Sequence, residues 1–361
     1  MRPEDYRLIL AAILGIGLSI VLIVRGRLHP FVALLSGAFV VGIIAGLPIA
    51  DTAKAIQKGA GDILGGTGLV VALGLALGAM LQLSDAAAGL ARTALRWAGV
   101  RGAPWASVAT GLLIGLPLFF ETGLVLLLPI VAAAAAAAAG ATQDSAKLGL
   151  MLSALAGLSV VHALVPPHPG PLLAVEALHA DLLRTLGYGL LIGIPTAIVA
   201  GPVLAKFTAR GVKLAPPLLA PTVLNMPAPA NWRALLVVLM PVVLIAAGQA
   251  VALLPPPVAA RFGVLAVASN PVLAVLMACL AALPLLFGRR IGDAKVQEAI
   301  WAETMQPAGA ILLAIGAGGA LKQVLVTAGL SDLLARVATG GPLSPIVLAW
   351  LVAVCIRLAT G

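Results

Sequence analysis

The chain has 361 residues, of which 61% are hydrophobic and only 10% are charged, and its mean hydropathy is +1.13. A soluble domain carries about 25% charged residues, so this composition excludes a water-soluble fold and predicts an all-α polytopic membrane protein. Apolar runs of about 20 residues match membrane helices, whereas a transmembrane barrel needs alternating segments of about 10 residues. The net charge of +9 comes from basic residues scattered between the apolar runs, as in cytoplasmic loops, and does not predict nucleic-acid binding.

The first part of the chain predicts membrane spans that alternate with short polar segments. Residues 8–24 and 30–50 form two apolar runs, and the first has no small-residue cleavage site, so we expect a retained span and not a signal peptide. Residues 69–83 form a third run with GxxxG spacing, which lets helices approach closely. Residues 84–101 predict an amphipathic helix at the membrane surface.

The second part of the chain follows a basic, proline-rich connection at residues 206–232. We expect this connection to be a cytoplasmic linker between an N-terminal transmembrane repeat, residues 1–205, and a C-terminal transmembrane repeat, residues 233–361. The whole chain is expected to hold about nine to eleven membrane-entering segments, because half-spans and full spans look alike in sequence.

Two glycine-rich segments resemble each other and favour the repeat. Residues 68–91 and 309–335 both begin apolar, continue through closely spaced glycines and end in an amphipathic helix. Many secondary transporters contain such repeats, often inverted, although membrane helices rich in Gly, Ala and Leu also resemble one another by composition alone. Nothing after the last apolar run matches residues 111–171, so we expect the second repeat to be incomplete.

The segment from residue 111 to residue 171 carries ionisable side chains and helix breakers at membrane depth. Its first part, GLLIGLPLFFETG, places Glu121, Thr122 and Gly123 between long apolar runs. A charged carboxylate at the centre of a membrane helix costs about 2.5–3.5 kcal/mol on insertion scales, and such residues are usually functional. We expect Glu121 to accept a proton or to face a bound ligand. The alternative is a structural carboxylate bonded to backbone amides at a helix break.

The second part of the segment, HALVPPHPGP, cannot form a continuous helix, because its prolines lack backbone donors. Broken backbone at this depth is tolerated only where it is packed in protein or lines a wet cavity. Pro167, His168 and Gly170 are therefore candidate binding residues, and His168 can bond a carboxylate or relay a proton. His162 is expected to support His168, or else to be a satisfied core histidine. We expect no metal site, because two imidazoles without a further Cys or acidic cluster make a poor zinc site.

A third candidate group lies near the C-terminal end. Gly318 belongs to the sequence GAGG, and Lys322 and Gln323 follow it in an otherwise apolar run. We expect the helix to be broken over residues 316–322, with Lys322 buried as the partner of an anion. The alternative is a lysine that extends to the membrane surface. Arg357 is either a second anion contact or an ordinary cation at a helix end.

At these motifs the sequence resembles the gluconate permease family of proton symporters. The resemblance rests on GLPLFFETGLVLLLPI, HALVPPHPGP, GAGGALKQVLVTAGLSDLLA and the terminal RLATG, and it runs from Arg27 to Gly361 in the family's order. It implies proton-driven import of gluconate or a related sugar acid or hydroxycarboxylate at a bacterial inner membrane. It also implies an ion-transporter-type fold with inverted repeats, re-entrant hairpins and broken helices, and a chain truncated at the C-terminus relative to the family.

The resemblance suggests roles and leaves alternatives open. Glu121 and His168 would couple protons to transport, and the other candidate residues would hold the anion. The expected partners are a small anionic sugar acid, H+ and the lipid bilayer, with no cofactor and with a homodimer as one open oligomeric state. Na+ coupling, a different organic anion and a non-transporting remnant are alternatives. A membrane enzyme with Glu121 and His168 as acid and base would need a nucleophile or cofactor pocket that the sequence does not show.

Overall fold

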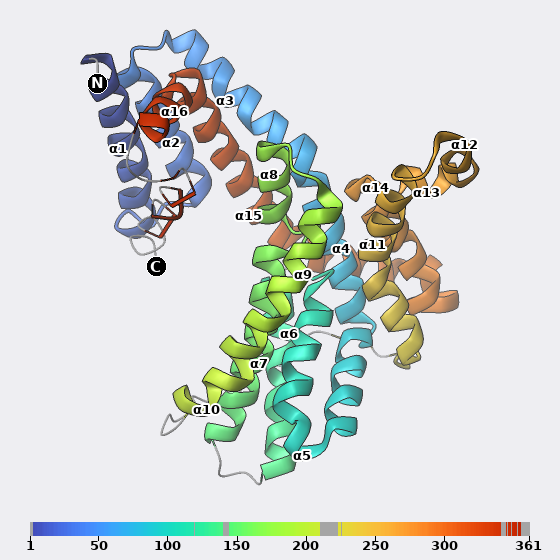
Figure 1. The fold of residues 1–361 in the computed structure, drawn as a ribbon. Helices are drawn as coiled ribbons and strands as arrows, with labels where there is room; N and C mark the ends of the chain where they lie inside the picture. The colour runs from blue at the N-terminus through green and yellow to red at the C-terminus, as the bar shows by residue number, and fades with distance from the viewer. Residues whose placement is uncertain are drawn as a thin grey trace. The chain divides into compact units, whose positions relative to one another are not determined.

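The structure of the protein, a computed structural model, is built of α-helices (Figure 1). It describes residues 3–118, 120–139, 144–209, 223–224, 226–340, 344, 346–347, 349–351 and 353–354. Within this part of the chain there is no strand, and seven helical segments are long and apolar enough to cross a membrane: Pro3–Val24, Ile49–Leu83, Asp144–Leu178, Leu182–Thr208, Asn231–Ala252, Pro271–Gly292 and Ala294–Thr327. Pro30–Ala45 is a shorter apolar helix. The prediction of an all-α polytopic membrane protein is confirmed.

The chain divides into two compact units. Unit 1 contains residues 1–68 and 309–361, and unit 2 contains residues 69–308. This division follows spatial contacts, so it does not test the predicted sequence repeat with its linker at residues 206–232. That repeat stays a prediction.

Unit 1 begins with two packed helices, α1 (Pro3–Val24) and α2 (Pro30–Ala45), followed by α3 (Ile49–Ile63) and the π-helical η1 (Leu64–Gly68). α2 begins at a proline, whose fixed φ suits a first helical turn. Gly46, the residue after α2, lies in the left-handed region, where a residue without a Cβ is favoured. The predicted spans at residues 8–24 and 30–50 are thereby confirmed as helices, the second ending five residues earlier.

Unit 1 also contains two later helical elements before residue 341. These are the second part of α15 (Ala294–Thr327) and α16 (Leu330–Gly340). The expected helix break over residues 316–322 is wrong, because α15 passes through these positions as continuous helix. Two of its glycines serve packing instead: a Cβ at Gly316 would lie 3.3 Å from the Leu64 Cδ1, and a Cβ at Gly319 would lie 2.5 Å from the carbonyl oxygen of Gly59 in α3. Small residues let membrane helices approach closely, so the GAGG sequence marks a helix crossing.

Unit 2 contains the helices that position the candidate site. A bundle is formed by α5 (Ala86–Gly115), α6 (Phe120–Ala139), α7 (Asp144–Leu164) and α9 (Leu182–Ile198), and α7 contacts the other three (Figure 1). The short α8 (Pro169–Leu178) connects α7 and α9. The other elements of unit 2 before α15 are α4 (Leu69–Leu83), η2 (Val199–Val203), α10 (Leu204–Thr208), α11 (Asn231–Ala252), α12 (Pro256–Ala259), η3 (Ala260–Phe262), α13 (Gly263–Val267), α14 (Pro271–Ala282), η4 (Leu283–Phe287) and η5 (Gly288–Gly292).

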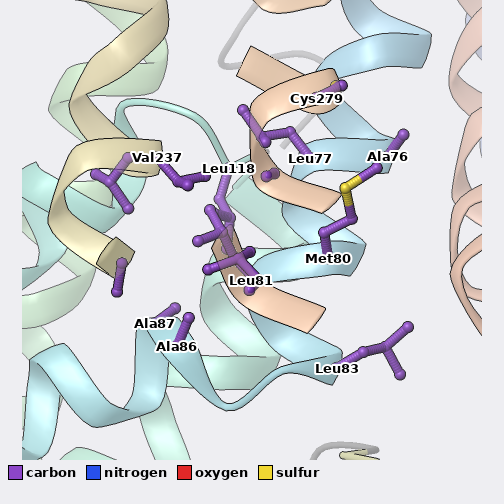
Figure 2. Packing of buried hydrophobic residues seen from close by; sticks show 14 of the residues in the cluster. Ala76, Leu77, Met80, Leu81, Leu83, Ala86, Ala87, Leu118, Val237 and Cys279 are labelled. Carbon is purple, nitrogen blue, oxygen red and sulfur yellow. The ribbon is translucent and has the colours of Figure 1, made fainter. Parts of the chain in front are cut away.

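The largest hydrophobic cluster of unit 2 surrounds α4 (Figure 2). Leu77 and Leu81 of α4 are 0% exposed. Val237 of α11, Cys279 of α14 and Leu118, which follows α5, belong to the same cluster. A helix that is apolar on all sides is suited to burial among other helices. This cluster fixes α4 against the turn that follows α5, where the candidate site lies.

The two segments that resemble each other in sequence also share a local turn. Asp85 stands between α4 and α5 at φ 59°, and Gly329 stands between α15 and α16 at φ 92°. The left-handed region favours glycine and admits aspartate more readily than most residues. The same turn therefore precedes an amphipathic helix in both segments, which supports the predicted repeat without testing its orientation.

Candidate functional site

Two helix breaks lie in the segment that was predicted to hold the site. α7 ends at Leu164 and α8 begins at Pro169, so the predicted break at the proline cluster is confirmed. α5 ends at Gly115 and α6 begins at Phe120. Glu121 is therefore in the first turn of α6, immediately after a break.

The side chain of His168 joins the two breaks. Its Nε2 lies 2.7 Å from the carbonyl oxygen of Gly115, 53 residues earlier in the chain. A carbonyl oxygen only accepts hydrogen bonds, so the imidazole donates from Nε2–H. His168 is 3% exposed. The last turn of a helix leaves carbonyl groups without intrahelical donors, and this buried ring supplies a donor to one of them.

Leu158 of α7 contacts both ends of the first break. A Cβ at Gly115 would lie 3.1 Å from the Leu158 Cδ1, and a Cβ at Gly123 would lie 2.6 Å from the same atom. Leu158 is 0% exposed. The two glycines therefore leave room for one leucine between the end of α5 and the start of α6, and this packing fixes where the break lies on α7.

His162 lies beside His168. Their ring centroids are 4.8 Å apart, and the ring of Phe120, at the start of α6, lies 6.4 Å from that of His162. These separations are in the range of aromatic contacts. The structure thus brings both histidines and the first residue of α6 into one cluster. Among the described residues no group of three or more His, Cys, Asp and Glu side chains is placed to hold a metal ion.

A small cavity adjoins both breaks. Its lining comes from the two breaks and from α4, α11 and α14, namely Val70, Gly74, Leu77, Leu116, Pro117, Pro167, His168, Pro241 and Val275. The cavity has room for about one water molecule. A larger ligand at this place requires the surrounding helices to move apart.

Each break is followed by a helix N-terminus, that of α6 at Phe120 and that of α8 at Pro169. The first amides of a helix together carry about half a positive elementary charge, and broken membrane helices bind anionic groups in this way. Prolines occupy positions 169 and 171 of α8, so Gly170 supplies the amide between them. Gly170 is exposed, and a Cβ built there would meet no more distant part of the described chain within 4 Å.

The side chains of three predicted site residues lie outside the described part of the structure. Glu121 and Thr122 lie on the described backbone of α6, and their side chains fall outside the description. Arg357 lies outside the described residues. The roles predicted for these residues stay predictions.

Gly318, Lys322 and Gln323 lie on α15 in unit 1. Lys322 is exposed, which corrects the expected burial and agrees with the alternative of a lysine extended toward solvent. The Gln323 side-chain amide donates a long hydrogen bond of 3.4 Å to the hydroxyl of Thr327. A Cβ at Gly318 meets no atom within 4 Å. Their part in ligand binding stays a prediction.

The sequence did not identify the residues that hold the two breaks together. The carbonyl of Gly115 and the side chain of Leu158 perform this task. One signal was present, because glycines stand on both sides of the interruption in GLPLFFETG. Leu158 carries no such signal, since it is one leucine among several in α7 and only its contacts distinguish it.

Fold and site together define a class of protein. Several helical segments are suited to span a membrane, and two interruptions meet at one buried histidine, an arrangement typical of secondary transporters with broken helices. A family model described as GntP family permease matches residues 7–361. The chain belongs to this family, and it is a membrane permease and not an enzyme.

Named transporters resemble nearly the whole chain. A gluconate permease of Pseudomonas aeruginosa is 38% identical over 366 residues, covering 100% of this chain and 80% of the relative. The Gnt-II system L-idonate transporter of Escherichia coli K12 is 35% identical, covering 96% of this chain and 78% of the relative. The D-serine transporter DsdX of Escherichia coli O6:H1 is 31% identical, covering 97% and 78%. The resemblance drawn from the motifs is confirmed.

Proposed function

We propose that the protein imports gluconate or a related sugar acid across the bacterial inner membrane by proton symport. The observation that carries the proposal is the meeting of two helix breaks at His168 in a chain of the GntP permease family. Two relatives are named for gluconate and L-idonate, which are both six-carbon polyhydroxy carboxylates. A third is named for D-serine, which also carries a carboxylate and a hydroxyl group.

The substrate carboxylate is proposed to bind at the N-termini that follow the breaks. The start of α8 offers the amide of Gly170, an exposed residue, and the start of α6 lies next to His162 through Phe120. Helix N-termini stabilise anions through partial positive charge and directed N–H groups. The interrupted backbone around Pro167 adds polar groups for the hydroxyls, because a broken helix leaves amides and carbonyls without helical partners.

Glu121 is the proposed proton carrier. It stands in the first turn of α6 immediately after a break, between apolar runs. An ionised Glu121 would repel an incoming carboxylate at this depth, and protonation removes that repulsion. Proton uptake and anion binding therefore favour each other, which is the coupling that symport requires.

Reconstitution in proteoliposomes tests the proposal. Uptake of radiolabelled gluconate is measured after an imposed inward proton gradient and, separately, after an inward Na+ gradient. We expect uptake with the proton gradient alone, and we expect Glu121→Gln to abolish it, because glutamine cannot take up a proton. Glu176→Gln removes an exposed acid of α8 and is the matched control. Normal uptake by Glu121→Gln would exclude this residue as the carrier, and uptake driven by Na+ would exclude proton symport.

A second candidate cargo is a hydroxylated amino acid, favoured by the similarity to a D-serine transporter. Competition separates the two candidates: unlabelled L-idonate and D-serine are added in excess to the gluconate assay. Inhibition by L-idonate alone supports a sugar-acid site. Stronger inhibition by D-serine than by L-idonate would reassign the cargo.

A further inference from the structure

We propose that His168 is a positioning residue that fastens the two helix breaks together and does not carry the transported proton. The proposal rests on the proposed transport function where it is tested by gluconate uptake. Where it is tested by thermal stability, it depends only on the geometry of His168. It changes the role that the sequence suggested for this histidine.

The side-chain geometry fits a fastening role. The Nε2 of His168 donates to the Gly115 carbonyl at 2.7 Å, and the ring is 3% exposed. The acceptor is a neutral backbone carbonyl, which does not exchange protons. Of the described titratable side chains, that of His162 lies beside the ring, at 4.8 Å between centroids. The Nε2–H is thus committed to the end of α5.

The backbone of His168 fixes the start of α8. Its carbonyl accepts from the amide of Leu172 at 3.0 Å, and its own amide donates to the carbonyl of Val165 at 3.3 Å. The ring and the first turn of α8 therefore move together. A bond from this ring to Gly115 sets the position of the Gly170 amide relative to the first break.

Two substitutions separate fastening from proton transfer. In His168→Gln the side-chain amide can still donate from a nitrogen at a similar reach, but it cannot take up a proton at physiological pH. We expect it to keep the melting temperature, the rate of gluconate uptake and the pH profile of uptake. His168→Ala removes the donor and leaves a buried carbonyl unsatisfied, so we expect a lower melting temperature and uptake slower by about tenfold or more.

His179→Asn is the matched control, because His179 is an exposed histidine at the other end of α8, at φ 50°, where asparagine is tolerated. A folded His168→Gln protein with lost or pH-shifted uptake would overturn the proposal, as would an unchanged melting temperature in His168→Ala. If the wild-type protein imports no gluconate, the proposed function fails, while the melting temperatures still decide whether His168 fastens the breaks.

A second and independent observation concerns a surface of unit 2 where a hydrogen bond between Thr93 and Asn231 links α5 to α11, beside two exposed pairs, Arg96–Trp97 of α5 and Trp232–Arg233 of α11. We infer that this surface, the arginine–tryptophan patch, binds the headgroup of an anionic phospholipid. Trp97 is 88% exposed and Trp232 is 60% exposed. The Arg233 guanidinium carbon lies 5.4 Å from the centre of the Trp232 ring, within cation–π range.

One side-chain hydrogen bond links the two helices of the patch, and a second one orients Arg96 within α5. The Thr93 hydroxyl accepts from the Asn231 side-chain amide at 2.9 Å and from Arg96 at 3.4 Å. Within the described part of the chain neither Arg96 nor Arg233 is in an ion pair with a carboxylate, whereas the nearby Arg92 is paired with Asp85. The patch therefore keeps its positive charge.

The position of the patch favours a lipid headgroup. α11 is a candidate membrane span that begins at Asn231, so its first residues lie near headgroup depth, where tryptophan is enriched. Arginine binds phosphate groups through paired N–H donors. An anionic headgroup meets both requirements, because its phosphate faces the arginines while its acyl chains lie along α11.

Melting of the purified protein in detergent, titrated with short-chain phosphatidylglycerol or phosphatidylcholine, tests this inference. We expect phosphatidylglycerol to raise the melting temperature more than phosphatidylcholine does. Arg96→Gln with Arg233→Gln should weaken the apparent affinity for phosphatidylglycerol by about 30-fold. Arg96→Lys with Arg233→Lys retains the charge and should lose less affinity, which separates charge loss from misfolding.

The matched control removes two positive charges elsewhere in unit 2, as Arg289→Gln with Lys295→Gln, both exposed. An equal loss of affinity in this control would overturn the assignment to the patch. An equal rise in melting temperature with inorganic phosphate at the same concentration would overturn the assignment to a lipid headgroup.

Discussion

At Gly123 the space that a side chain would occupy is already filled. A Cβ there would lie 2.6 and 2.8 Å from the two methyl carbons of Leu158. Overpacking of this kind destabilises by about 1–3 kcal/mol. We expect Gly123→Ala to lower the melting temperature and to slow uptake, because the start of α6 must move away from α7. Thermal unfolding in detergent and the proteoliposome assay measure the two effects.

Two further variants test whether the contact with Leu158 causes the loss of stability in Gly123→Ala. One changes a different glycine, and the other changes Leu158 itself. Gly170→Ala adds the same atom where nothing lies within 4 Å, so it should leave the melting temperature nearly unchanged. Leu158→Ala combined with Gly123→Ala should lose less stability than the sum of the losses in the two single variants, because residues in contact couple energetically. Simple additivity of the two single changes would show that the contact is not responsible.

Proline correctly predicted the helix break at the proline cluster, whereas glycine wrongly predicted a break at residues 316–322. The prolines in PPHPGP prevent one continuous helix, and the structure has the break between Leu164 and Pro169. The glycines in GAGG permit a break but also permit close packing, and α15 uses Gly316 and Gly319 for packing. Local sequence cannot decide between these two uses, because the decision depends on which helix lies opposite. The position of His168 at a helix break was predicted, whereas its acceptor, 53 residues away, was not.

Between helices, the contact of α3 with α15 depends on Gly59. A Cβ there would lie 2.5 Å from the Cβ of Gln323 and would also press on the carbonyl of Gly319. We expect Gly59→Ala to separate the two helices and to destabilise the protein by about 1–3 kcal/mol. Gly61→Ala is the matched control on the same helix, because nothing lies within 4 Å of its Cβ. Alanine there should be neutral or stabilising, since it favours helix more than glycine does.

Thermal unfolding of Gly59→Ala and Gly61→Ala in the same detergent tests whether the glycine contact holds α3 against α15. Equal melting temperatures for Gly59→Ala and Gly61→Ala would mean that α3 and α15 adjust without loss, and that the glycine contact does not hold them. The comparison also bears on the GAGG sequence, because the same crossing accounts for Gly319.

For the whole chain, composition and the apolar runs predicted the helical membrane fold, because these depend on local hydropathy. The grouping of helices did not follow from the sequence: residues 1–68 join residues 309–361 in unit 1, and that pairing depends on contacts between distant segments. The repeat of residues 1–205 and 233–361, its inversion and a homodimer stay predictions. The shared turn at Asp85 and Gly329 is the local structure that favours the repeat.

An ion pair links the beginning of unit 1 to its later part. Arg336 of α16 donates to the Asp5 carboxylate of α1 at 2.8 Å, across 331 positions of sequence. The Asp5 side chain is 8% exposed and that of Arg336 is 54% exposed. Removing one partner of such a pair costs more than removing an exposed pair, because a buried charge loses its partner. We expect Arg336→Gln to destabilise unit 1 by about 1–3 kcal/mol.

Asp51→Asn is the matched comparison, because Asp51 pairs with Lys54 at 3.8 Å with side chains 52% and 79% exposed. Exposed pairs contribute about 0–1 kcal/mol, so this variant should unfold close to the wild-type temperature. Hydrogen exchange gives the local readout: in Arg336→Gln the amides of α16 should exchange faster, while those of α7 in unit 2 should keep their wild-type rates. Unchanged exchange in α16 would mean that the link to Asp5 is not what holds α16 on α1.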